Sequence, residues 1–178
     1  QKTAYEIVSR DWSSDVCSSD LVDTKRVTVV SPDAGRVRVA EKWTDVLGAP
    51  LAIIHKRRDP DVPNQVKMFE VVGEVEDRIC VIVDDMIDTG GTIAKAAETL
   101  FEAGAADVIV AATHGIFSDP AAQRLSNSNI SKVLVTDSLP IAAENHFPKL
   151  EVLSIAPLIA KAITEVFTEG SVTGIFDQ

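Results

Sequence analysis

The apolar run at residues 79–83, Ile-Cys-Val-Ile-Val, constrains the fold of this chain more than any other segment. It contains no polar side chain, no proline and no glycine, and it is too short for an ordinary helix. A strand with one exposed face alternates apolar and polar residues, whereas a continuous apolar run indicates a strand covered on both faces. Such strands belong to parallel sheets with helices on either side, so the run predicts an α/β fold.

Short β-branched runs alternate with helical patterns along the rest of the chain, which is typical of parallel strands joined by crossover helices. We predict strands at 27–30, 51–55, 108–112, 133–136 and 152–155, and an edge strand within 68–75. We predict helices at 37–47, 92–103 and 157–167, and a short one after the capping pair Asp119-Pro120. The predicted fold class is therefore α/β, with a parallel sheet flanked by helices.

Residues 1–21 differ in kind from the remainder, because they show no apolar periodicity and are rich in Ser and Asp clusters. Translated backwards, they match the indexed adaptor oligonucleotide of a short-read sequencing library in a single reading frame. We interpret 1–21 as an artefactual, non-native segment and 22–178 as the natural domain. A natural flexible polar arm is the alternative. Because position 22 opens directly before a predicted strand, we expect the gene product to be longer toward its amino terminus.

The charge balance limits the partners of this chain. The 17 Lys and Arg residues are outnumbered by 27 Asp and Glu, which gives a formal net charge of −10, and no basic block occurs. The resulting field repels nucleic acid and anionic membranes, so we expect neither as a partner. No apolar run reaches the roughly 18 residues that span a bilayer, and no secretory signal is recognisable, which predicts a cytoplasmic protein.

The segment 83–92, Val-Asp-Asp-Met-Ile-Asp-Thr-Gly-Gly-Thr, joins the apolar run to the predicted helix at 92–103. The carboxyl end of a buried strand is where open α/β sheets bind ligands. Gly90 and Gly91 let backbone N–H groups approach an oxyanion, and the helix N-terminus adds positive potential. Asp84 and Asp85 are acceptors for the vicinal hydroxyls of a sugar, directly or through Mg²⁺. The candidate sugar-phosphate site consists of Asp84, Asp85, Asp88, Thr89, Gly90, Gly91 and Thr92.

Residues 84–92 resemble the ribose-phosphate-binding motif of the type I phosphoribosyltransferase fold. That motif leaves two enzyme classes open: phosphoribosyltransferases, which consume phosphoribosyl diphosphate, and ribose-phosphate pyrophosphokinases, which make it from ribose 5-phosphate and ATP. Further segments resemble the second family in the same order and spacing, namely 29–33, 53–58, 63–64, 112–114 and 171–173. The chain from residue 22 onward is therefore similar to the carboxy-terminal half of a ribose-phosphate pyrophosphokinase.

This resemblance implies roles for individual residues. Lys56 matches the catalytic lysine of the family and Arg58 its partner on a flexible loop, where cations stabilise the charge that spreads over the diphosphoryl group during transfer. Asp33 matches a Mg²⁺ ligand, since a hard cation that bridges ATP phosphates needs oxygen donors. Asp33, Gly35 and Arg36 fall on the family's diphosphate loop. The resemblance also implies ribose 5-phosphate and ATP as ligands and a homo-oligomer, which is a hexamer in the family.

The chain departs from the family pattern at Arg36, where a second glycine is usual. Its guanidinium would either obstruct the diphosphate or clamp it. His114, at the end of a predicted strand, is interpreted as a hydrogen-bonded structural histidine.

Two alternatives to a pyrophosphokinase stay open. A phosphoribosyltransferase would need a base-recognising segment, which we do not find. A non-catalytic regulatory homologue is disfavoured by Lys56, Arg58 and the complete motif at 84–92. The other half of the family's enzymes, which by resemblance supplies most of the ATP site, has no counterpart in 22–178, so we expect this chain to be inactive alone.

Overall fold

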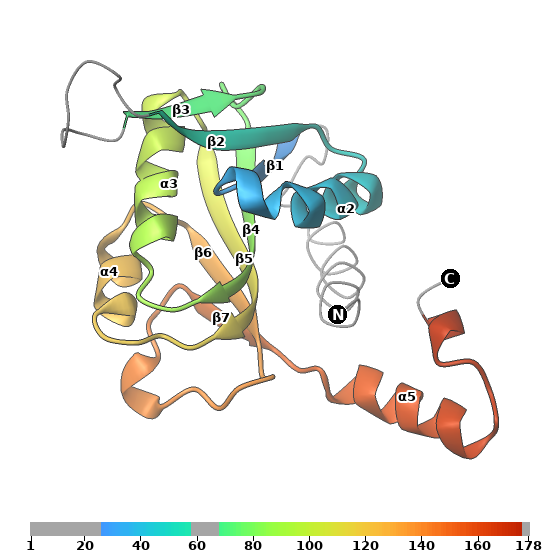
Figure 1. Cartoon of the computed structure of the whole chain (residues 1–178). Helices are drawn as coiled ribbons and strands as arrows, with labels where there is room; N and C mark the ends of the chain where they lie inside the picture. The colour runs from blue at the N-terminus through green and yellow to red at the C-terminus, as the bar shows by residue number, and fades with distance from the viewer. Residues whose placement is uncertain (1–25, 58–67, 176–178) are drawn as a thin grey trace.

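The computed structural model describes residues 26–57 and 68–175. Within these ranges the strands form one sheet in the order β3-β2-β1-β4-β5-β6-β7 (Figure 1). The strands are β1 Val27–Ser31, β2 Leu51–Arg57, β3 Met68–Val72, β4 Ile79–Ile87, β5 Asp107–Gly115, β6 Lys132–Thr136 and β7 Leu150–Leu153. Only the edge strand β3 is antiparallel to its neighbour in this sheet. The predicted α/β class, the parallel sheet and the edge strand are confirmed.

The helices lie close to their predicted positions. They are α2 Val37–Leu47, α3 Gly91–Glu102, α4 Ala121–Asn127 and α5 Ala156–Phe167, and a 3-10 turn at Ala34–Arg36 precedes α2. The predicted cap at Asp119 is wrong: α4 has Pro120 as its N-cap residue and no side-chain capping bond. The backbone replaces that cap, because the N–H of Ala121 donates to the carbonyl of Ser118 at 2.9 Å.

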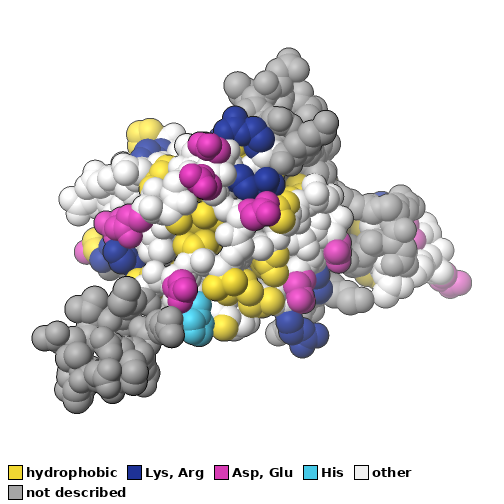
Figure 2. Space-filling model, turned by 90° about the horizontal axis from the view of Figure 1, so that it is seen from above, with side chains coloured by type: hydrophobic (Ala, Val, Ile, Leu, Met, Phe, Trp, Pro, Cys, Tyr) yellow, Lys and Arg dark blue, Asp and Glu magenta, His cyan; other side chains and the backbone are white. Residues whose placement is uncertain are grey.

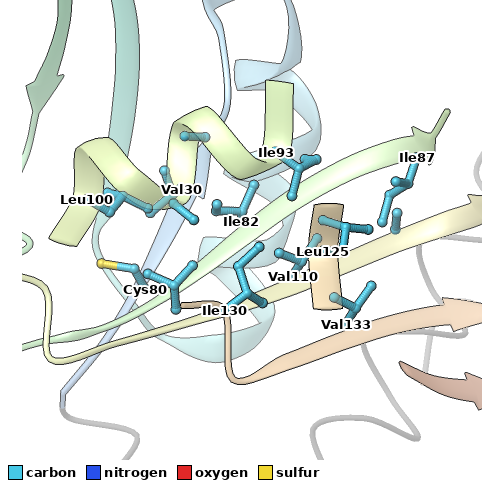
Figure 3. Close-up of a cluster of buried hydrophobic side chains, with 14 of the residues drawn as sticks. Val30, Cys80, Ile82, Ile87, Ile93, Leu100, Val110, Leu125, Ile130 and Val133 are labelled. Carbon is cyan, nitrogen blue, oxygen red and sulfur yellow. The ribbon is translucent and has the colours of Figure 1, made fainter. Parts of the chain in front are cut away.

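Helices cover both faces of the sheet, as the apolar run at 79–83 predicts. Alternate residues of β4 enter two separate cores: Val81 and Val83 pack toward α2 with Trp43, whereas Cys80 and Ile82 pack toward α3 and α4. Figure 3 shows the second core, with Ile93 and Leu100 of α3 facing the sheet. Burial raises the pKa of the Cys80 thiol to about 12, which agrees with its interpretation as a small core side chain.

Two strands run past the carboxyl end of β1 and leave a notch in that edge of the sheet. The last residue of β1, Ser31, pairs with Ile53, but β2 continues to Arg57 along β3. On the other side β4 continues to Ile87, since β5 offers partners as far as Gly115. The predicted strand ends at 55 and 83 were therefore too early. β1 also lies where the chain switches direction across the sheet, which is where α/β folds bind ligands.

The last helix projects from the body of the molecule (Figure 1) and buries none of its residues. Most of its large apolar side chains are exposed, including Ile159, Ile163 and Phe167, the last at 84%. The sequence periodicity predicted this helix correctly at 157–167 but not its lack of packing. β7 lies at Leu150–Leu153 rather than at 152–155.

The surface on the side of β2 and β3 carries acidic and basic side chains interspersed with hydrophobic ones (Figure 2). None of the helices in the described part of the chain has the length and apolarity needed to cross a membrane.

Candidate active site

A cavity of about 300 Å³ opens at the notch above β1. It brings together residues from two separate segments of the sequence: the turn after β1, and the continuous stretch that runs from the end of β4 into the start of α3. The lining residues are Asp33, Arg36, Asp84, Met86, Ile87, Asp88, Thr89, Gly90, Gly91, Thr92 and Ile93. Of the remaining predicted site residues with described side chains, Asp85 and Gly35 lie beside the cavity without lining it.

The segment 88–92 forms the turn from β4 into α3. Gly90 is the N-cap residue of α3 and has a φ of 68°, in the left-handed region that glycine enters without strain. Its carbonyl already accepts the helical bond from the N–H of Ala94 at 2.9 Å. The free N–H groups of the first turn of α3 and the partial positive charge of the helix face this end of the cavity, so the turn has the features of an anion site.

Asp84 and Asp85 are in β4, not in the turn after it, and both are held by Arg36. The Nε of Arg36 lies 3.1 Å from Oδ1 of Asp84, and its Nη1 lies 2.8 Å from Oδ2 of Asp85. The N–H of Asp85 donates to Oδ1 of Asp84 at 2.8 Å. Arg36 therefore binds the two carboxylates predicted to accept sugar hydroxyls, an arrangement that neither sequence alternative for Arg36 anticipated.

The electrostatics of this pair are unusual for aspartates beside an arginine. Burial, followed by the side-chain hydrogen bond with Asp85, raises the pKa of Asp84 to about 6, although Arg36 opposes the rise. The Oδ1 atom of Asp85 is buried and has no hydrogen-bond partner among the described residues. A buried carboxylate oxygen without a partner is costly.

Asp33 acts as the N-cap of the 3-10 turn, with its Oδ1 accepting from the N–H of Gly35 at 2.8 Å. This is the local role that strand-end aspartates commonly have. Asp33 also lines the cavity with Asp84, so two carboxylates from β4 and from the turn after β1 share one space.

Of the two predicted catalytic cations, Lys56 and Arg58, the structure describes only Lys56, and only its backbone. Lys56 belongs to β2, where its backbone pairs with Phe69 of β3 beyond the end of β1. Arg58 lies outside the described residues. His114 has a bond of the expected kind, because its Nδ1 lies 2.7 Å from Oγ of Ser138.

Arg124 of α4 was missed by the sequence reasoning. Its Nη1 donates to the carbonyl oxygen of Thr89, in the turn that forms the anion site. The sequence carries no signal for this contact, since Arg124 follows Thr89 by more than thirty positions and lies in a short helix without a motif.

Comparison with known proteins identifies the family. A family model described as the phosphoribosyl synthetase-associated domain matches residues 60–177. The chain belongs to this family. The ribose-phosphate pyrophosphokinase of Streptomyces coelicolor is 64% identical over 157 residues, which cover 88% of this chain and 48% of that protein. The same enzyme of Mycobacterium leprae is 62% identical over 87% of this chain and 47% of its own length. The chain thus spans about half the length of these curated relatives.

Solved structures agree with this assignment. Phosphoribosylpyrophosphate synthetase from Mycobacterium smegmatis superposes with a TM-score of 0.80 and 49% identity, over 94% of this chain and 51% of that one. Orotate phosphoribosyltransferase from Aeropyrum pernix superposes over 88% of this chain with a TM-score of 0.52 and 19% identity, which shows a shared fold alone. The resemblance to ribose-phosphate pyrophosphokinases, stated above from the sequence, is confirmed.

Proposed function

We propose that residues 22–178 are the ribose-phosphate-binding half of a ribose-phosphate pyrophosphokinase. The complete enzyme would transfer the diphosphoryl group of ATP to the C1 hydroxyl of ribose 5-phosphate, giving phosphoribosyl diphosphate and AMP. The observation that carries the proposal is the cavity at the notch, which pairs an anion-binding helix N-terminus with the carboxylate of Asp84 from β4 in one space. Such a pairing suits a ligand with a phosphate at one end and hydroxyls at the other.

The two ends of the cavity orient the sugar in this proposal. The 5-phosphate lies in the turn 88–92, where backbone N–H groups and the hydroxyls of Thr89 and Thr92 are available as donors. The ribose hydroxyls then reach Asp84 and Asp85 and compete with Arg36 for their oxygens. An arginine released by the sugar becomes free to bind the diphosphate, which favours the clamping alternative over obstruction.

The proposed transfer step depends on cations at the edge of the notch. Lys56 lies on β2, which runs past β1 on the side opposite β4, so its strand borders the same crevice. We assign Lys56 and Arg58 to the stabilisation of negative charge that develops on the diphosphoryl group, where fixed cations act most strongly once water is excluded.

The cofactor in this proposal is Mg²⁺. The described residues contain no group of three or more His, Cys, Asp or Glu in metal-binding proximity. The oxygens of Asp33 and Asp84 in one cavity fit a hydrated hard cation that takes its other ligands from phosphates and water. Bound there, Mg²⁺ would neutralise phosphate charge, and Asp33 would be its ligand from this chain.

The relatives are about twice as long as the part of them that this chain matches, which bears on the proposed partners. We propose that the ATP site is completed by the half of the enzyme that this chain does not span, and that further copies complete the enzyme as a homo-oligomer in the cytoplasm. On this basis the chain by itself binds the sugar but transfers nothing.

Titration calorimetry with this chain tests the proposal. We expect ribose 5-phosphate to bind in the presence of Mg²⁺, and ribose to bind at least tenfold more weakly, because it lacks the dianion that the α3 N-terminus stabilises. With ATP added, AMP formation should stay at background. Equal affinities for ribose and ribose 5-phosphate would contradict the placement of the phosphate, and robust AMP formation would contradict the assignment as half of an enzyme.

We propose in addition that residues 1–21 have no part in this function. The alignment to the Streptomyces relative spans 157 residues, the length of 22–178, which supports this division. Deletion of 1–21 should leave the melting temperature unchanged or higher and the affinity for ribose 5-phosphate unaltered, as measured by calorimetry. A fall of several degrees on deletion would show that the segment belongs to the folded domain.

A further inference from the structure

The backbone of the anion-binding turn is held from outside the cavity by α4. The guanidinium of Arg124 donates from Nη1 to the carbonyl oxygen of Thr89, the residue before the N-cap Gly90. Arg124 does not line the cavity. It lines a separate cleft of about 460 Å³ between α3 and α4, and Gly91 borders both spaces. The turn is therefore a wall with the cavity on one side and Arg124 on the other.

The orientation of one peptide plane depends on this contact. In a trans peptide the carbonyl oxygen and the amide hydrogen point in opposite directions. With the carbonyl of Thr89 drawn toward Arg124, the N–H of Gly90 points toward the cavity. The reversed plane would direct a carbonyl oxygen at a bound phosphate, and glycine allows that reversal because its backbone enters both halves of φ space.

The helix segment that carries Arg124 is held in place by core packing. The next residue, Leu125, is fully buried in the same core as Ile87 and Ile93 (Figure 3). A Cβ added at Gly90 would lie 3.3 Å from Cγ of Leu125, so α4 packs directly behind the turn. Core packing therefore fixes the position of the helix segment that carries the guanidinium.

No ion pair with Arg124 occurs in the part of the chain that the structure describes, although the chain carries a formal net charge of −10. An added Cβ at Gly91 would be 3.5 Å from Nη1 of Arg124, which places the cation against the first residue of α3. Its field adds to that of the helix N-terminus at the same turn.

We infer that Arg124 is a positioning residue for the phosphate end of the site. It holds the Thr89–Gly90 peptide with its N–H toward the ligand and supplies a second positive charge behind the turn. This inference rests on the proposed function, because the ligand it concerns is the phosphate of ribose 5-phosphate.

The test compares Arg124→Met with Lys95→Met in this chain. Lys95 lines the same cleft and is a matched control, since its loss removes the same charge while its bond is to Glu98 and not to the turn. We expect Arg124→Met to shift the amide resonances of Gly90 and Gly91 in the ligand-free protein and to weaken ribose 5-phosphate binding about ten- to hundredfold. Lys95→Met should leave the resonances in place and the affinity within about twofold. Arg124→Gln is measured in the same way where Arg124→Met does not fold.

The outcomes separate this inference from the function on which it rests. Unshifted glycine resonances in the Arg124 variant, or a shift with wild-type affinity, would overturn the positioning role. A wild-type chain that binds no ribose 5-phosphate would overturn the proposed function. In that case, a shift of the glycine amide resonances in the Arg124 variant alone would still support the contact between Arg124 and the turn.

Discussion

Replacing Lys56 by alanine in a full-length synthetase that carries this domain should lower kcat by about 10²- to 10³-fold with little change in the KM for ribose 5-phosphate. The reason is that negative charge on the diphosphoryl group grows only as transfer proceeds, so a cation aimed at it stabilises the transition state more than the bound sugar. The structure places the backbone of Lys56 on β2, beyond the end of β1 and across the notch from β4.

Steady-state kinetics with ribose 5-phosphate as the varied substrate would measure the effect. Lys42→Ala, an exposed lysine of α2, is the control for loss of a charge and should leave both constants near their wild-type values. If Lys56→Ala raised the KM for the sugar and left kcat intact, the lysine would be an anchor for the ground state and its assignment to the transfer step would be wrong.

Replacing Asp84 by asparagine should stabilise this chain at pH 7 to 8 while weakening its affinity for ribose 5-phosphate about ten- to hundredfold. Burial is the main reason that the pKa of Asp84 is raised from its usual value of 3.8 to about 6 in the folded chain. Folding therefore favours the protonated carboxyl, and the folded state binds more protons than the unfolded state between these two pKa values. Ionisation of Asp84 costs stability as the pH rises through that window.

The expected gain in the free energy of unfolding is roughly 1 to 3 kcal/mol above pH 7, and it should vanish below about pH 3, where both states carry the proton. Asparagine keeps an oxygen acceptor for the N–H of Asp85, so the backbone at this end of β4 should stay intact. Chemical denaturation at several pH values measures the gain, with Asp45→Asn on the exposed face of α2 as the control. An Asp84→Asn chain that is less stable than wild type at pH 8 would show that the ion pair with Arg36 outweighs the cost of burial.

The prediction for Asp84 describes a residue that lowers the stability of the fold and contributes to binding. One end of β4 has a carboxylate with a raised pKa and an arginine shared between two aspartates. It also has a buried oxygen for which the described ranges contain no hydrogen-bond partner. Perturbed groups of this kind concentrate at functional sites, because the fold holds them in place for a ligand that completes their interactions.

Local patterns in the sequence determined the class of fold, most of the helix bounds and the location of the turn between β4 and α3. The continuous apolar run at 79–83 predicted a strand covered on both faces, and β4 is that strand. α2 ends at Gly48, which has a φ of 60°, because glycine adopts that conformation at low cost. The glycine pair at 90–91 marked the start of α3 for the same reason.

Strand ends and long-range contacts were decided only by the tertiary structure. β4 extends to Ile87 because β5 supplies hydrogen-bond partners there. The residues of β4 alone do not predict this extension. The pairing of Arg36 with Asp84 and Asp85, and that of Arg124 with Thr89, join segments far apart in the chain. A local sequence pattern reports propensity and burial within one element, whereas such contacts depend on how whole elements pack, so they emerge only when the sheet and its helices are assembled.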